Sequence, residues 1–217
     1  MQHLIPTADT REAVPTEADP LPALLNRLSI TTWDLLIVGD GSGTTWEKAC
    51  GWSSVLIDRQ TRQRRMFYGA TNAGSVNFAE SMPYLQALNW FDQHFGKDRL
   101  ETLGSMEVWI ITDSQVIANW GASAMSPDSR TPRKQGAYWA AMRYLKSVGY
   151  NCHFRWFPRM STQLNAAADL VAGLSRVAMT HVDPDTTNTG RRQAEAAIAQ
   201  LDFRMPDQSP LDIYTLY

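Results

Sequence analysis

Short apolar runs alternate along the middle of this chain with segments in which apolar residues recur every three or four positions. The runs are bounded by Gly, Thr, Pro and charged residues, as strands are. The first three are separated by short loops, which indicates an antiparallel meander, and the fourth is typical of a central strand. These five predicted strands are residues 33–39, 50–58, 62–70, 108–112 and 150–157.

Helical periodicity fills the gaps between these strands. The predicted helices are residues 78–94, 114–120, 136–148 and 162–179, the last rich in Ala and Leu. Three consecutive strands followed by alternating helices and strands predict an α/β fold. We expect one five-stranded mixed sheet, with its first three strands antiparallel, flanked by helices.

The two ends of the chain are polar and lack the regular apolar pattern of the middle part. We therefore predict three regions. Residues 1–30, which begin with a segment rich in Pro, Thr, Asp and Glu, form a flexible leader in this interpretation. Residues 31–179 form the folded domain. Residues 180–217 form a C-terminal extension with a short helix at 191–201, which could serve self-association or a protein partner.

Composition narrows the class of protein. The chain has 217 residues, is 44% hydrophobic and carries a formal net charge of -2. The acidic excess lies in the two ends, because residues 31–179 hold 15 basic and 12 acidic residues, a balance that permits nucleic-acid binding. We expect no membrane span and no secretory signal. Two cysteines, Cys50 and Cys152, are too few for a disulfide framework and favour a cytoplasmic protein.

Four acidic residues occupy positions that together suggest a metal site. Asp40 and Asp113 end the first and fourth predicted strands, Glu80 lies in the first turn of a predicted helix, and Asp169 lies inside another. Alone, each acid could simply belong to a turn, cap a helix or interact favourably with a helix dipole. Together they could converge at the carboxyl ends of neighbouring strands. Clustered carboxylates suit Mg²⁺ or Mn²⁺, and two such ions would favour phosphodiester cleavage.

The residues around these acids resemble motifs of the type 1 ribonuclease H (RNase H) family across residues 33–179. The matching segments are Asp40-Gly41-Ser42, Thr71-Asn72, Asn77-Phe78-Ala79-Glu80, Ala87-Leu88, Thr112-Asp113-Ser114-Gln115, Trp156, Pro158-Arg159, Asn165 and Ala168-Asp169-Leu170-Val171-Ala172. A single one of these motifs would be weak, but all of them in order are a specific signal.

The resemblance implies an RNase H-like fold and an endonuclease that hydrolyses the RNA strand of RNA–DNA hybrids. It implies that two Mg²⁺ ions, for which Mn²⁺ may substitute, are bound by the catalytic residues Asp40, Glu80, Asp113 and Asp169. It also implies substrate contacts, which would select RNA through its 2′-OH. The candidates for these contacts are Gly41, Ser42, Asn77 and Gln115. Arg159 is a further candidate, which could contact a phosphate group. Asn77 could equally be a helix N-cap.

The sequence departs from the family at one functional position. The family commonly has a His in the loop before its last Asp, where it is thought to assist proton transfer or product release. Here residues 158–164 contain no His, and Arg159 is the charged residue in that loop. We therefore expect slower turnover.

Two other classes of function remain open. A junction resolvase or transposase-like nuclease could share the fold, although resolvases place their Glu at a strand end rather than in a helix. Exonucleases of this fold begin with Asp-x-Glu, which Asp40-Gly41-Ser42 lacks. A non-catalytic scaffold that only binds nucleic acid is the second alternative, and the presence of all four acids argues against it.

Overall fold

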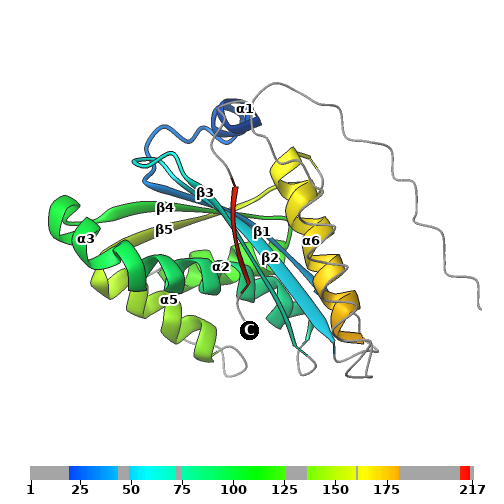
Figure 1. Ribbon diagram of the computed structural model, residues 1–217. Helices are drawn as coiled ribbons and strands as arrows, with labels where there is room; N and C mark the ends of the chain where they lie inside the picture. Colours follow the sequence, from blue (N-terminus) through cyan, green and yellow to red (C-terminus); the bar gives the residue numbers. More distant parts are fainter. Residues whose placement is uncertain are drawn as a thin grey trace, which may run out of the picture.

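The computed structural model describes residues 20–43, 49–71, 75–125, 136–159, 161–180 and 211–215. A twisted sheet lies between two helical layers (Figure 1). The elements are α1 (Pro20–Arg27), β1 (Leu35–Gly43), β2 (Cys50–Asp58), β3 (Arg64–Thr71), α2 (Val76–Phe91), the π-helical turn η1 (Asp92–Gly96), α3 (Lys97–Leu103), β4 (Met106–Thr112), α4 (Gln115–Met125), α5 (Gly136–Val148), β5 (Tyr150–Trp156), α6 (Gln163–Thr180) and β6 (Leu211–Thr215).

The sheet has the strand order β5-β4-β1-β2-β3-β6. β1, β2 and β3 form the predicted antiparallel meander, whereas β4 is parallel to β1 and β5 is parallel to β4. The predicted α/β class and mixed sheet are thereby confirmed. β1 lies in the middle of the sheet, and the covering of both its faces explains why its first residues form an uninterrupted apolar run.

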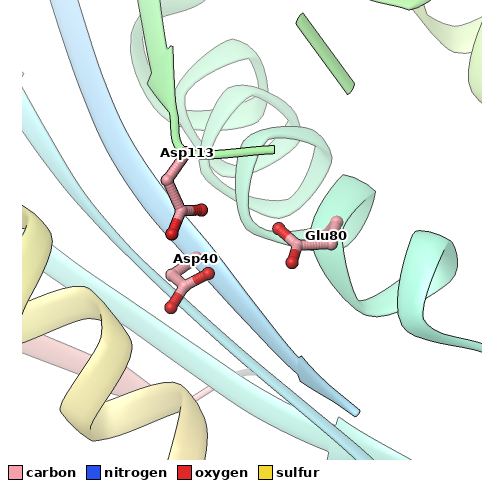
Figure 2. A group of neighbouring side chains, drawn as sticks. All are labelled: Asp40, Glu80 and Asp113. Carbon is pink, nitrogen blue, oxygen red and sulfur yellow. The ribbon is translucent and has the colours of Figure 1, made fainter. Parts of the chain in front are cut away.

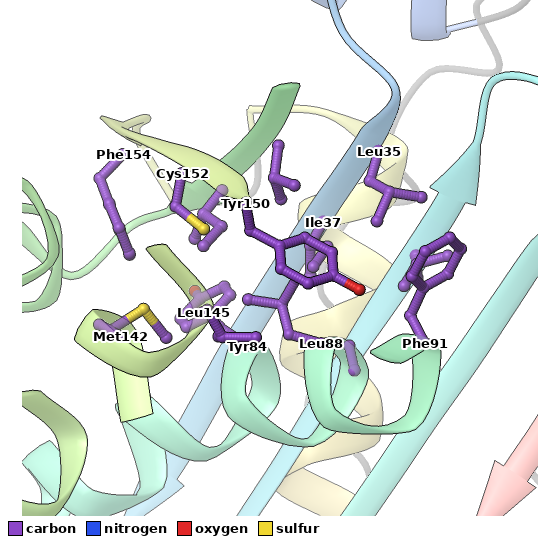
Figure 3. Close-up of a cluster of buried hydrophobic side chains, with 14 of the residues drawn as sticks. Leu35, Ile37, Tyr84, Leu88, Phe91, Met142, Leu145, Tyr150, Cys152 and Phe154 are labelled. Atoms are coloured by element: carbon purple, nitrogen blue, oxygen red, sulfur yellow. The ribbon is translucent and has the colours of Figure 1, made fainter. Parts of the chain in front are cut away.

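Two apolar cores cover the two faces of the sheet. Leu35 and Ile37 of β1 point toward α2, α4 and α5, where they pack with Tyr84, Leu88 and Phe91 of α2 (Figure 3). Leu36 and Val38 point to the other face and pack with α1 and α6. The alternation along one strand thus fixes which helices lie on which side.

The structure extends the folded part of the chain at both ends of the predicted domain. Leu24 of α1 and Ile30, both within the predicted leader, are buried in the second core. β6, from the predicted extension, pairs in parallel with β3 and makes a sixth strand. The predicted helix at residues 191–201 lies outside the described residues. Within the described ranges, none of the helices combines the length and apolar character that crossing a bilayer requires.

Helix α2 begins earlier than the sequence predicts. Its N-cap is Ser75, whose hydroxyl accepts a hydrogen bond from the backbone N–H of Phe78 at 3.2 Å. The alternative that Asn77 caps this helix is therefore wrong, and Glu80 lies in the second turn rather than the first. Pro83 stands inside the helix and has no N–H to donate to the carbonyl group four residues earlier.

Candidate metal centre

The register of β1 and β4 brings Asp40 and Asp113 together. Their parallel pairing ends at Gly39 opposite Thr112, and each acid is the next residue along its strand. Asp40 was predicted to end its strand, but β1 continues to Gly43 in pairing with β2. The ladder with β4 stops at this point because β4 ends at Thr112, and Asp113 follows directly.

The close approach of β1 to α2 brings Glu80 to the same place. A Cβ atom on Gly41 would lie 2.3 Å from the backbone nitrogen of Glu80 and 2.6 Å from the carbonyl oxygen of Ala79. No residue other than glycine fits such a contact. Gly41 thus holds the helix turn that carries Glu80 directly against the strand that carries Asp40.

Three carboxylates converge at this point. Oxygen atoms of Asp40, Glu80 and Asp113 all lie within 4.8 Å of one another, and Figure 2 shows the side chains facing one another from β1, α2 and the end of β4. Among the described residues, none of the three forms an ion pair with a Lys or Arg. Glu80 Oε2 is buried and has no hydrogen-bond partner there. Oxygen ligands in this arrangement fit a hard divalent cation such as Mg²⁺.

The electrostatics of the three carboxyl groups favour the binding of a cation. Burial, together with repulsion from Asp113 and Glu80, raises the pKa of Asp40 to about 9. Burial and repulsion from Asp113 raise the pKa of Glu80 to about 8. Burial also raises the pKa of Asp113, although the nearby guanidinium of Arg159 opposes the shift. A bound divalent cation would reverse these shifts, because it favours the charged forms.

Asp169, the fourth predicted ligand, has a different partner. It lies on α6 and forms an ion pair with Arg159, the charged residue of the loop before that helix. Its carboxylate also lies close enough to the Asp40 side chain to add to the upward shift of the Asp40 pKa. Asp169 is therefore adjacent to the other three acids, but its charge is already balanced by a cation of the protein itself.

Helix α6 is fixed in place by contacts with β2. The buried Ser53 hydroxyl donates a hydrogen bond to the carbonyl oxygen of Ala168 at 2.7 Å. At Gly51 a Cβ atom would lie 2.3 Å from the carbonyl oxygen of Ala172. Since Ala168 immediately precedes Asp169, these contacts hold the fourth carboxylate beside the cluster.

The predicted substrate-binding residues lie around the acids. Ser42 follows Gly41 on β1, and its hydroxyl accepts a hydrogen bond from Nε of Arg176 at 3.0 Å. Asn77 is exposed in the first turn of α2, and Gln115 is exposed at the start of α4. Their positions leave both side chains open to a ligand, and their contacts with a substrate stay predictions.

Two further residues support the site, and the sequence analysis missed the first of them, Tyr84. The buried Tyr84 hydroxyl donates to the carbonyl oxygen of Gly39 at 2.8 Å, directly before Asp40. The spacing of four between Glu80 and Tyr84, on one face of α2, was the signal available for it. Trp156 is 50% exposed, and its indole N–H donates to the carbonyl oxygen of Asp113 at 2.9 Å.

No family model matches the chain, and no curated protein matches it in sequence. Solved structures do match it. LC11-RNase H1, isolated from compost by a metagenomic approach, matches with a TM-score of 0.52 and 20% identity over 67% of this chain and 97% of that chain. The same protein in complex with an RNA/DNA hybrid matches with a TM-score of 0.50 and 20% identity over 66% and 96%.

A further match is the N-terminal RNase H domain of Rv2228c from Mycobacterium tuberculosis, solved as a fusion with maltose-binding protein. It has 16% identity and a TM-score of 0.48 over 75% of this chain and 99% of that chain. The similarity to LC11-RNase H1 shows that this chain has an RNase H-like fold, as the motifs predict.

Proposed function

We propose that this protein is a type 1 ribonuclease H, an endonuclease that hydrolyses the RNA strand of RNA–DNA hybrids with two Mg²⁺ ions. The observation that carries the proposal is the cluster of Asp40, Glu80 and Asp113 where the pairing of β1 with β4 ends, on an RNase H-like fold. LC11-RNase H1, which shares the fold, was solved with an RNA/DNA hybrid.

The donor set fits the proposed ions. Three carboxylate groups lie within reach of one cation, and the buried Glu80 Oε2 lacks a partner among the described residues. We assign Asp40, Glu80 and Asp113 as ligands, with Asp169 as the fourth once its carboxylate is available. Bound ions of this kind would activate a water molecule and stabilise the leaving oxygen.

The residues around the cluster would bind the hybrid. The backbone at Gly41 and Ser42 and the side chains of Asn77 and Gln115 are our candidates for contacts with the nucleic acid. Contacts with the 2′-OH would distinguish RNA from DNA. Arg159 carries the positive charge beside the acids and would bind a backbone phosphate.

The test is a cleavage assay with a strand-labelled RNA–DNA hybrid and Mg²⁺, run beside duplex RNA, duplex DNA and a four-way junction. Wild type is compared with Asp113→Asn and with the matched control Glu107→Gln, which removes a carboxylate from the other end of β4. We expect cleavage of the RNA strand of the hybrid alone. This cleavage should be lost in Asp113→Asn and in EDTA, and kept in Glu107→Gln.

The other outcomes discriminate between the alternatives. Cleavage of the junction instead of the hybrid would assign a resolvase. Tight binding of the hybrid without cleavage of any substrate would assign a non-catalytic scaffold. Replacement of Mg²⁺ by Mn²⁺ should preserve cleavage, since both ions accept carboxylate ligands.

A further inference from the structure

The ion pair between Arg159 and Asp169 divides the four acids into two unequal sets. Asp40, Glu80 and Asp113 offer oxygen atoms to one point, whereas Asp169 holds a guanidinium group. The Asp169 side chain is 11% exposed and that of Arg159 is 62% exposed. The carboxylate is thus fixed within the protein, while its cation reaches it from the solvent side.

We propose that Arg159 is a built-in cation that takes the place of one of the two divalent ions, so that the protein without nucleic acid binds a single divalent ion tightly. This inference rests on the proposed metal-dependent function and concerns how the same site is filled. It assigns to Arg159 a role in metal stoichiometry that is separate from any contact with phosphate.

The charges of the site support this assignment. Four ionised carboxylates carry four negative charges, and Arg159 supplies one positive charge within the same group. With Arg159 in place, one divalent ion leaves a single negative charge and a second would leave a single positive charge, so the second ion brings the site no closer to balance. Without Arg159, two divalent ions balance the four carboxylates. A buried group of charges is stable only when it is close to balanced.

Competition for ligand atoms acts in the same direction. A second ion bound through Asp169 would share that carboxylate with a guanidinium group already hydrogen-bonded to it. Arg159 is also close enough for its charge to act on both Asp113 and Glu80. Its charge therefore acts on the whole cluster rather than on Asp169 alone.

The test counts bound Mn²⁺ ions by isothermal titration calorimetry and by electron paramagnetic resonance, on the full chain without nucleic acid. Wild type should bind one ion tightly, and Arg159→Gln should bind two. Arg155→Gln is the matched control, because Arg155 is an exposed arginine of β5 that stacks over Trp109 at 5.3 Å and contacts none of the four acids in the described structure. It should behave as wild type. Arg159→Gln/Asp169→Asn should return to one ion, since the freed ligand is removed as well.

The outcomes separate this inference from the proposed function. Two ions of similar affinity in wild type, or one ion in Arg159→Gln, would overturn the role of Arg159 and leave the nuclease proposal standing. Binding of no Mn²⁺ by any variant would overturn both. Arg159→Gln takes the cation away from the largely buried Asp169 carboxylate, so the metal-free variant should melt at a lower temperature than wild type. Thermal unfolding monitored by circular dichroism checks that it is folded at the temperature of the titrations.

Discussion

The β1–β2 ladder carries two buried aspartates, and the two are satisfied in opposite ways. Asp58 lies opposite Leu35 at one end, and Asp40 lies opposite Ser53 toward the other. Asp58 accepts hydrogen bonds from the guanidinium of Arg99 at 2.8 Å, the N–H of Gln60 at 2.9 Å and the hydroxyl of Thr61 at 2.9 Å.

Asp40 is 5% exposed but has no such set of donors. Within the described structure it accepts a hydrogen bond from the N–H of Gly41 at 2.8 Å, and its charged neighbours are other carboxylates. A buried carboxylate that has its own cation is satisfied within the fold, and the fold is destabilised when that cation alone is removed. Asp40, which is surrounded by carboxylates, needs a cation from outside the protein. Asp58 therefore has a structural role, and Asp40 a functional one.

The largest effect should follow from Asp40→Asn. The variant removes the central ligand, and metal ions supply several kcal/mol of transition-state stabilisation, so hybrid cleavage should fall by about 10³-fold or more. The same change relieves repulsion among the acids, so the metal-free variant should melt at a higher temperature than wild type. Initial rates and thermal unfolding in EDTA measure the two effects. Undiminished cleavage would remove Asp40 from the catalytic set.

Arg99→Leu should lower the stability of the protein and leave its cleavage activity unchanged, the reverse of Asp40→Asn. It leaves Asp58 buried without its cation, which should lower the free energy of unfolding by about 3 kcal/mol. Urea denaturation measures this loss, and cleavage below the melting temperature should stay near wild type. Lys97→Ala is the control, because its ion pair with Glu101 spans 3.9 Å between exposed side chains and should contribute less than about 0.5 kcal/mol. Equal losses in the two variants would contradict the assigned role of Asp58.

The pH dependence of the metal-free protein should expose the acid cluster. The folded pKa values of Asp40 and Glu80, about 9 and about 8, lie above their ordinary values of 3.8 and 4.5. The folded state therefore holds protons that the unfolded state releases, and stability should fall as pH rises from about 4 to about 9.

Thermal unfolding across that pH range, with EDTA or Mg²⁺, checks the prediction. Mg²⁺ should stabilise the protein most at the high end of the range, where its ligands are ionised. In Asp40→Asn the slope should be shallower. A melting temperature that is independent of pH in EDTA would show that the cluster is not strained by its own charge.

Glu107 is a third carboxylate, less buried than Asp58 and Asp40, and its contribution to stability should be smaller. It is partly exposed; burial opposes its ionisation, but hydrogen bonds from His153 and Asn151 outweigh this effect and lower its pKa. A lowered pKa contributes stability that is lost as pH falls through the folded value, below 4.5. Glu107→Gln should cost about 0.5 kcal/mol or less at neutral pH, measurable by urea denaturation. If Glu107→Gln lowered the free energy of unfolding as much as Arg99→Leu does, the expectation that less buried carboxylates contribute less to stability would be wrong.

The sequence identified the four acids and most of the strands because both depend on local patterns. The apolar run before Asp40 and the short run before Asp113 predict strands directly, and motif order relates them to a known fold. What it missed depends on side-chain direction or on contacts far apart in the chain. The partner of Asp169 is an arginine ten residues away whose orientation no periodicity encodes. The pairing of β6 with β3 joins segments separated by most of the chain.

The pairing of β6 with β3 also has a consequence for the chain during translation. Leu211–Thr215 leaves the ribosome after every other described residue, yet it covers the outer edge of β3, which is complete at Thr71. During translation the hydrogen-bonding groups of that edge stay open to other nascent chains, which is the usual route to aggregation. Once β6 docks, a five-residue strand becomes the border of the sheet in place of an eight-residue one, so a segment synthesised long after β3 covers the edge that is exposed to aggregation until then.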